Sequence, residues 1–296
     1  MYDCIVIGGG PAGLTAAIYL ARFRRSVLVI NKGHSRMTNA PRIKNLICYA
    51  EGISGNALLR RLKRQARLYS LEVLKGEAII SKKRGLFEVN AGEKTYSAKF
   101  VVVATGIRDK QPSGINWREL CHYGLLKYCP VCDGFEQTNK KIAVLINSNA
   151  GFKKVIFISQ FSKKIIAVVT KDIVVSSQAK NKMRRMGIKI AKGKLVQLKQ
   201  HPLRKTLVVK LEHVPAFKVH MAYVELGSNV AASAFKQLRG LCRLQNGRLK
   251  TNRHQETSVK RLYAAGDCTN SLAQVSVAAA EGAIAATDIH NQLNKE

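Results

Sequence analysis

A glycine-rich turn near the start of the chain places the strongest constraint on its fold. An apolar run over residues 3–7 leads into the sequence GGGPAG at residues 8–13, and a helix-like stretch continues to about residue 24. A second apolar run follows over residues 26–30. The order strand, glycine turn, helix and strand is typical of the first βαβ unit of a dinucleotide-binding fold. We therefore expect an α/β protein that opens with such a unit.

The residue types in this turn each have a physical reason. Gly8 permits the tight turn, Gly10 lets the backbone approach a pyrophosphate, and Gly13 lets the helix pack close to the strand. Pro11 suits the start of a helix, and Ala12 is the small residue that follows it. The helix N-terminus would then face the phosphates. These five residues are predicted to bind a dinucleotide.

The second strand ends in an unusual residue for such a unit. An acidic side chain is expected there, where it accepts hydrogen bonds from the adenosine ribose. This chain has Asn31, followed by Lys32. Asparagine still accepts a hydrogen bond, and the lysine adds a cation close to the phosphates. We predict that both residues line the dinucleotide site, with a weaker ribose contact.

A second motif, CPVCDGFE at residues 129–136, contains two cysteines separated by two residues. Such a pair can cycle between thiols and a small-loop disulfide. Zinc is the competing interpretation, because Cys121 and His122 lie shortly upstream and would complete four ligands. Adjacent residues point in opposed directions on a regular element, whereas structural zinc sites usually present two paired knuckles. We predict a redox pair at Cys129 and Cys132, and no metal.

Composition narrows the setting of this chemistry. Seven cysteines is an odd number, and one close pair does not make a secreted disulfide framework, so a reducing compartment fits better. The N-terminus begins directly with a strand and does not resemble a signal peptide. No apolar run reaches the roughly 18 to 20 residues of a membrane span. We expect a cytoplasmic protein without membrane contact.

The formal charge of +32 is the other unusual feature. Basic residues form separate clusters along the chain, at residues 22–25, 60–64, 82–84, 163–164 and 180–185. Such a charge has three interpretations: drift on solvated faces, an acidic redox partner, and nucleic acid. Because the clusters form no single arm or stripe interleaved with aromatic residues, we do not expect nucleic-acid binding.

Four motifs in a fixed order give the chain a specific resemblance. They are the turn at residues 8–13, the strand 100–104 with Thr105-Gly106, the element 129–134, and the strand 262–265 closing on Gly266-Asp267. With these motifs the chain resembles the low-molecular-weight thioredoxin reductase family of flavoprotein disulfide reductases, along almost its whole length. The resemblance implies FAD as cofactor, a thioredoxin-like protein as partner, and a homodimer.

The resemblance also assigns roles at the dithiol. Cys132 would lie against the flavin and exchange electrons with it, and Cys129 would attack the disulfide of the partner. Asp133 would act as acid or base. A carboxyl group beside the pair can move the proton that thiol–disulfide exchange requires, which gives this assignment a physical basis.

Further cofactor contacts follow from the same resemblance. Asp267 would bind the ribityl chain of FAD, and the helix that begins near Gln274 would present its N-terminus to the flavin. The complete set implied beyond the first turn and its strand is Arg36, Asn45, Ala104, Thr105, Gly106, Gly266, Asp267, Gln274 and Val275.

The middle of the chain departs from the family. A second glycine turn, for NADPH, is expected after the strand 142–146, but the sequence there is NSNAG at residues 147–151. Only Gly151 is a glycine, and it stands where neither the tight turn nor the phosphate approach needs one. The strand 165–170 is not followed by the arginine segment that grips the 2′-phosphate in the family. Residues 225–228 stand where the family has another pyridine-nucleotide signature, and here that signature is degenerate. We therefore expect no NAD(P)H binding.

Another electron donor is then required. The sequence leaves open three options. They are an acidic carrier such as ferredoxin or flavodoxin, which a basic surface would attract, molecular oxygen, which would make the protein a dithiol oxidase, and an unidentified small reductant. A conventional NADPH-dependent thioredoxin reductase with an atypical turn is a further alternative. A flavin-bearing scaffold without activity is disfavoured, because the Cys129, Cys132 and Asp133 set is intact.

The expected architecture is α/β with two Rossmann-like nucleotide-binding domains. The FAD domain is discontinuous and covers residues 1–112 and 232–296. The redox domain, residues 113–231, is inserted between these two parts and carries Cys129-x-x-Cys132. In the family such domains rotate, and homodimers form through the FAD domains.

Overall fold

The computed structural model describes residues 1–201 and 205–296, which form two compact units. The first unit contains residues 1–38, 55–108 and 229–296, and the second contains residues 39–54 and 109–228. Residues 39–54, which the sequence analysis assigned to the FAD domain, cluster with the second unit.

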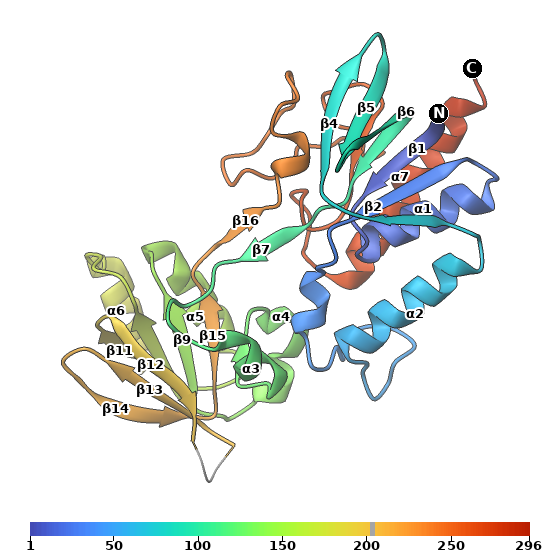
Figure 1. The fold of residues 1–296 in the computed structure, drawn as a ribbon. Coiled ribbons are helices and arrows are strands. Elements are labelled where there is room, and N and C mark those ends of the chain that lie inside the picture. The colour runs from blue at the N-terminus through green and yellow to red at the C-terminus, as the bar shows by residue number, and fades with distance from the viewer. Residues whose placement is uncertain (202–204) are drawn as a thin grey trace. The chain divides into compact units, whose positions relative to one another are not determined.

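The first unit is built on a seven-stranded sheet (Figure 1). Its strands follow the order β3-β2-β1-β6-β5-β4, with β17 also paired to β6. The strands are β1 (Tyr2–Ile7), β2 (Val27–Asn31), β3 (Glu72–Lys75), β4 (Ala78–Lys83), β5 (Leu86–Ala91), β6 (Lys94–Val103) and β17 (Leu262–Ala264). Strands β1, β2, β3, β6 and β17 pair in parallel, whereas β4 and β5 add an antiparallel meander.

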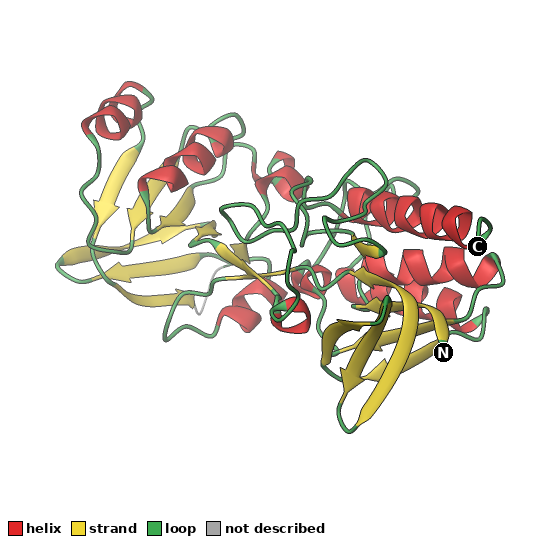
Figure 2. Cartoon of the chain, turned by 90° about the horizontal axis from the view of Figure 1, so that it is seen from above, coloured by secondary structure: helices red, strands yellow, loops and turns green. Residues whose placement is uncertain are grey.

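Both faces of this sheet are covered, which explains why its central strands are continuous apolar runs. Cys4 and Val6 of β1 pack into the cluster that includes α1 (Pro11–Arg22) and α7 (Val275–Leu293). Ile5 and Ile7 pack into the cluster on the other face. Helices α1 and α7 run side by side (Figures 1 and 2), and α2 (Gly55–Arg67) packs on α1.

The second unit contains a five-stranded parallel sheet with the order β11-β10-β9-β15-β8. A three-stranded antiparallel sheet, β12-β13-β14, packs beside it. The strands are β8 (Leu126–Lys127), β9 (Ile142–Ile146), β10 (Ile165–Val169), β11 (Lys189–Lys192), β12 (Leu195–Gln200), β13 (Leu207–Leu211), β14 (Val214–Val219) and β15 (Met221–Glu225). The helices are α3 (Trp117–His122), α4 (Pro130–Asp133), α5 (Phe152–Ile158) and α6 (Ser177–Arg185).

Two short strands, β7 (Ile107–Asp109) and β16 (Ser228–Val230), pair where the chain passes from one unit to the other and back. Short 3-10 turns at residues 36–39, 135–137, 149–151 and 233–235 complete the elements. Parallel sheets joined by helices confirm the predicted α/β class with two Rossmann-like units. Over the residues described, none of the helices combines the length and apolar character that a membrane crossing needs.

Candidate active site

The two cysteines of the CPVC motif form a disulfide at the start of α4. Their Cα atoms lie 5.4 Å apart, and the Cys132 backbone N–H donates to the Cys129 carbonyl oxygen at 3.1 Å. Pro130 occupies the first turn of the helix, where a missing N–H is tolerated. The local sequence therefore brings the sulfurs together without help from a distant segment. The second unit thus holds a dithiol–disulfide pair in its oxidised form.

The competing zinc interpretation depended on Cys121 and His122. Cys121 is buried in the core of the second unit, whereas His122 is exposed. Burial raises the pKa of the Cys121 thiol to about 11, so the thiolate that binds a metal is disfavoured there. Within the described ranges, no three histidine, cysteine or acidic side chains gather as a metal site would require.

Asp133 is held by two side chains from neighbouring strands. Its Oδ2 accepts a hydrogen bond from Lys127 Nζ at 2.5 Å, and its Oδ1 accepts one from the Tyr223 hydroxyl at 2.6 Å. Its backbone carbonyl accepts from Gln137 Nε2 at 3.1 Å. Burial of Tyr223, the charge of Asp133 and their hydrogen bond together raise the pKa of the Tyr223 hydroxyl, so it remains a donor. The sequence predicted Asp133 but neither of its partners.

The backbone of the turn after β1 depends on its glycines. Gly8 has a φ of +121°, and a Cβ there would overlap the carbonyl oxygen of Ala104. A Cβ on Gly13 would overlap the Gly8 carbonyl. At Gly10 the nearest atom to a Cβ would be the Ser35 hydroxyl, 3.6 Å away. The turn therefore leaves room beside the partly exposed backbone of Gly10, and α1 starts directly after it, with Pro11 as its first residue.

The residues at the end of β2 close one side of this turn. The Asn31 side chain lies against Gly9, where a Cβ would come within 2.5 Å of Nδ2, and its Oδ1 accepts from the Gly33 N–H at 3.1 Å. Lys32 forms an exposed ion pair with Glu77 at 2.6 Å. Asn31 is thus positioned beside the turn, while the Lys32 ammonium already has an anionic partner.

Two further predicted residues form a charged pair in the first unit. Arg36 Nη1 lies 3.1 Å from Asp267 Oδ2, and both side chains are less than one quarter exposed. Gly266, with a φ of +83°, donates its N–H to Glu281 Oε2 at 2.6 Å. Glu281 is 6% exposed and also accepts from the Thr269 hydroxyl. The sequence analysis missed Glu281, although it is the only charged residue between positions 275 and 287.

The residues that directly follow β6 indicate whether the first unit fits a bound cofactor. Ala104 is buried, and Gly106 has a φ of +65°. The Thr105 hydroxyl between them is buried, and nothing in the described part of the chain hydrogen-bonds to it. A buried hydroxyl without a partner is rare in a protein that binds nothing there. Together with the open turn at Gly10, it fits a polar ligand such as a dinucleotide.

The other predicted flavin contacts belong to different units. Gln274 precedes α7, and Val275 is its first residue, so both lie at a helix N-terminus in the first unit. Asn45 lies in the second unit, on a cavity of about 590 Å³ lined by residues 44–50. The structure therefore groups Asn45 with the dithiol unit and the remaining predicted cofactor residues with the first unit.

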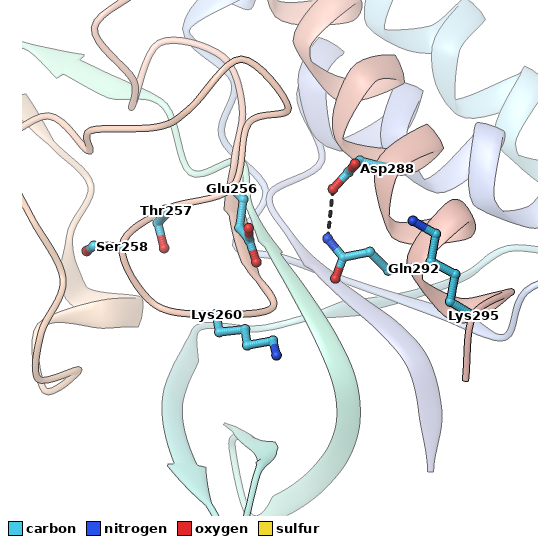
Figure 3. A pocket seen from close by; sticks show the side chains of 7 residues that line it. All are labelled: Glu256, Thr257, Ser258, Lys260, Asp288, Gln292 and Lys295. Carbon is cyan, nitrogen blue, oxygen red and sulfur yellow. Dashed lines mark hydrogen bonds between the residues drawn. The ribbon is translucent and has the colours of Figure 1, made fainter.

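A second cavity, of about 540 Å³, lies between α7 and the segment preceding β17 (Figure 3). On the α7 side of this cavity, Gln292 Nε2 donates a hydrogen bond to Asp288 Oδ2 at 2.9 Å. The lining residues are Glu256, Thr257, Ser258, Lys260, Asp288, Gln292 and Lys295. None of the predicted site residues lines it, so it does not coincide with the candidate site.

The turn after β9, residues 147–151, has side chains at positions where the first turn has glycines, and it is a filled turn in this sense. Asn147 Nδ2 donates to the Leu226 carbonyl at 3.1 Å, and Asn149 Nδ2 donates to the Val174 carbonyl at 3.0 Å. Asn149 Oδ1 also accepts from the Ser176 N–H at 3.2 Å. Gly151 packs on the strand, because a Cβ there would lie 2.8 Å from the side chain of Ile146. The retained glycine therefore serves packing.

A charged pair lies next to this turn. Lys154 of α5 forms an ion pair with Glu225, the last residue of β15, and donates to the Tyr128 carbonyl at 3.1 Å. Both side chains of the pair are less than one third exposed. Lys154 thereby links the helix after the filled turn to the residue that precedes Cys129.

Two Rossmann-like units, one with an open glycine turn and one with a disulfide in a Cys-x-x-Cys loop, define the class of a disulfide oxidoreductase. The family model for pyridine nucleotide-disulphide oxidoreductases matches residues 2–282. The chain belongs to this family, as a thioredoxin-reductase-like, FAD-dependent disulfide oxidoreductase. The predicted resemblance and enzyme class are thus confirmed.

Individual relatives agree with this assignment. The chain is 28% identical to the thioredoxin reductase of Bacillus subtilis (strain 168), over 100% of this chain and 96% of that protein. The crystal structure of thioredoxin reductase from Streptococcus pyogenes superposes with a TM-score of 0.90 at 24% identity, covering 100% of this chain and 99% of the other. Thioredoxin reductase from Giardia duodenalis gives a TM-score of 0.85 at 26% identity, covering 99% of each chain.

Proposed function

We propose that this enzyme exchanges electrons between FAD, the Cys129/Cys132 dithiol and a thioredoxin-like protein, and that it does so without NAD(P)H. The observation that carries the proposal is the difference between the two strand-to-helix turns. The turn at Gly8–Gly13 leaves backbone open for a pyrophosphate, whereas Asn147 and Asn149 hydrogen-bond to neighbouring carbonyls where a nicotinamide cofactor would need bare backbone.

The first unit offers the groups that would hold FAD. The turn at residues 8–13 and the N-terminus of α1 would receive the pyrophosphate, and Asn31 would accept from the ribose. Asp267, oriented by Arg36, would accept from the ribityl hydroxyls, and the buried Thr105 hydroxyl would gain a partner. When bound, FAD supplies two-electron redox chemistry. The remaining predicted contacts in this unit are Lys32, Ala104, Gly106, Gly266, Gln274 and Val275. Asn45, which was predicted with them, belongs to the second unit.

The dithiol would carry out the exchange with the partner. In the reduced enzyme the Cys129 thiolate attacks one sulfur of the partner's disulfide, an S–S bond forms to that sulfur, and the second partner sulfur leaves and takes up a proton. The Cys132 thiolate then displaces the first partner sulfur, so that the Cys129–Cys132 disulfide returns and the partner is a dithiol. The names of the thioredoxin reductase relatives support a thioredoxin-like substrate.

The basic surface supports an acidic protein carrier, such as a ferredoxin or flavodoxin, as electron donor. Helix α2 contains five basic residues and no acidic one, and all five are exposed. An acidic carrier would be attracted to such a surface. In the alternative direction of electron flow, the dithiol would reduce the flavin and oxygen would accept the electrons, which would make the enzyme a dithiol oxidase. Use of a pyridine nucleotide is favoured by one observation, the family to which the chain belongs.

An anaerobic titration tests the proposal. The purified flavoprotein is mixed separately with NADPH, NADH and dithiothreitol, and the flavin absorbance band is followed. Bleaching by dithiothreitol alone is expected, because the dithiol then reduces the flavin without a nicotinamide site. Rapid bleaching by NADPH or NADH would contradict the proposed loss of nucleotide binding. No bleaching by dithiothreitol would contradict the dithiol–flavin relay itself.

Three further expectations belong with this proposal. The FAD domain would cover residues 1–112 and 232–296, with residues 113–231 as the redox domain. The enzyme would be a cytoplasmic homodimer, as the family resemblance implies. Neither a metal nor nucleic acid takes part in the proposed reaction.

A further inference from the structure

The carboxylate next to the dithiol has two partners that the family motif does not include. Lys127 is the last residue of β8, and Tyr223 lies in β15. The two strands pair in parallel with Tyr223 opposite Lys127, so their side chains project from the same side of the sheet. Both reach Asp133, which directly follows Cys132. The sheet register, and not the local sequence, brings these three residues together.

The Lys127–Asp133 pair also closes the dithiol loop. Lys127 precedes Cys129 by two residues, and Asp133 follows Cys132 by one, so the ion pair joins the two ends of the segment that contains both cysteines. The two side chains are 14% and 18% exposed. An ion pair in such a partly dehydrated position is screened less than one on the surface.

This pair contributes to the net charge of the segment that contains the cysteines. An unpaired Asp133 carboxylate would disfavour a second negative charge on the neighbouring sulfur, because like charges repel. The Lys127 ammonium cancels that charge. Tyr223, which is fully buried, fixes the other carboxylate oxygen by donating its hydroxyl hydrogen. With both oxygens engaged, Asp133 is held as a carboxylate whose charge is compensated.

We propose that Lys127 and Tyr223 are positioning residues which, through Asp133, allow the thiolate of the reduced dithiol to form near neutral pH. When the thiolate forms, the S–H bond breaks and the proton passes to solvent, without electron transfer. This inference rests on the proposed function only in so far as the dithiol must be reduced and reactive. It adds two residues to the site, and it changes the role of Asp133 from the predicted acid or base to an ion-paired carboxylate.

Other charged and titratable groups face this cluster. Glu136 acts on the Tyr223 hydroxyl by its charge and lies 3.8 Å from Lys44, and Lys154 binds the Tyr128 carbonyl while paired with Glu225. The Cys121 thiol lies beside the Tyr128 hydroxyl, and burial, with a smaller contribution from the charge of Asp109, raises the pKa of both groups. Glu136 and Lys154 are thus each next to an opposite charge of their own. Lys127 is the cation that forms an ion pair with Asp133 and compensates its charge.

Alkylation of the reduced holoenzyme tests the inference without using an electron donor. The protein is reduced, freed of reductant and treated with iodoacetamide over a range of pH, and peptide mass spectrometry gives the rate at Cys129 and Cys132. In Lys127→Met, alkylation at neutral pH is expected to slow by roughly tenfold, with the rate profile moved to higher pH. Lys127→Arg keeps the charge and should retain most of the wild-type rate.

A charge-neutral double variant makes the test specific. Lys127→Met combined with Asp133→Asn removes both charges, so alkylation should return toward the wild-type rate. Tyr223→Phe keeps the charges and loses one hydrogen bond, and should slow the reaction by about twofold to fivefold. The exposed Cys48 and Cys242 serve as references within the same molecule, and Lys153→Met removes an exposed lysine as a control.

The outcomes are distinct. A wild-type profile in Lys127→Met, or a double variant as slow as the single one, would overturn the charge-compensation role, and an unchanged Tyr223→Phe would overturn the part given to Tyr223. Should Lys127→Met not fold, Tyr223→Phe still tests the proposal, because it keeps both charges and removes one hydrogen bond to Asp133. Because alkylation reads the thiols alone, its failure would leave the flavin titration untouched, and failure of the titration would leave the alkylation result standing.

Discussion

The turn after β1 and the turn after β9 occupy equivalent places in two Rossmann-like units. They differ in residue type, in backbone conformation and in the length of the helix that follows. The first contains glycines at positions 8, 9, 10 and 13, with Gly8 at a φ that other residues rarely adopt, and it leads into a 12-residue helix. The second contains asparagines at positions 147 and 149, has no positive φ over residues 147–151, and leads into a 7-residue helix.

The one glycine that the second turn keeps explains the difference. Gly13 and Gly151 each allow a helix to approach its strand, because a Cβ at either position would clash. This requirement belongs to the fold and persists whatever the unit binds. The glycine for phosphate approach serves the ligand, and the second turn has neither this glycine nor the glycine of the tight turn. A fold and its cofactor therefore constrain different glycines of the same motif.

The largest expected effect comes from adding a side chain to the first turn. Gly8→Val should prevent retention of FAD and destabilise the protein by about 3 kcal/mol or more, because of its positive φ and the overlap with the Ala104 carbonyl. Flavin content per protein and thermal unfolding measure both effects. As a matched change, Ser148→Val in the second turn should leave flavin content unchanged. Equal flavin loss in both variants would remove the distinction between the turns.

Restoring glycines to the second turn should have the next largest effect. Asn147→Gly combined with Asn149→Gly removes side-chain hydrogen bonds and adds backbone freedom, which should lower the free energy of unfolding by about 2 kcal/mol. NADPH should still fail to bleach the flavin, because the Lys154–Glu225 pair and the missing arginine segment remain. Denaturant unfolding and anaerobic spectra measure the two outcomes. Bleaching by NADPH would show that the asparagines alone prevent nucleotide binding.

Removing the charge next to the filled turn should give a smaller effect. Lys154→Met leaves Glu225 without its partner and removes the hydrogen bond to the Tyr128 carbonyl. A loss of about 1 to 2 kcal/mol in unfolding free energy is expected, together with altered dithiol reactivity, since Tyr128 precedes Cys129. Lys153→Met, on the exposed side of the same helix, is the control. Identical behaviour of the two variants would mean that the pair has no structural role.

The smallest expected effect concerns the buried hydroxyl of the first unit. Thr105→Val should leave the stability of the apoprotein nearly unchanged, because the hydroxyl has no partner among the described residues. FAD affinity should fall by roughly tenfold if the cofactor supplies that partner. Titration of apoprotein with FAD gives the dissociation constant, and Thr95→Val, at an exposed position, is the control. Unchanged FAD affinity would place the hydroxyl outside the cofactor site.

The local sequence was sufficient to predict a feature when a single short segment forms that feature. The glycine turn, the Cys129–Cys132 loop and the filled turn after β9 were each predictable, because neighbouring residues impose their backbone geometry. Glu281 was missed for the opposite reason, since it caps Gly266 from a helix that follows it by several residues and is recognisable only as a single charge in an apolar, small-residue stretch. The grouping of residues 39–54 with the second unit was likewise not readable from composition.

The sequence by itself determined the α/β class, the redox pair and the contrast between the two turns, because these depend on residue type and on spacings of a few positions. Tertiary structure alone decided which side chains hold Asp133. Lys127 and Tyr223 are 96 positions apart, and only the parallel pairing of β8 with β15 sets them opposite each other. Register between strands follows from the packing of the whole sheet, so no local pattern specifies it.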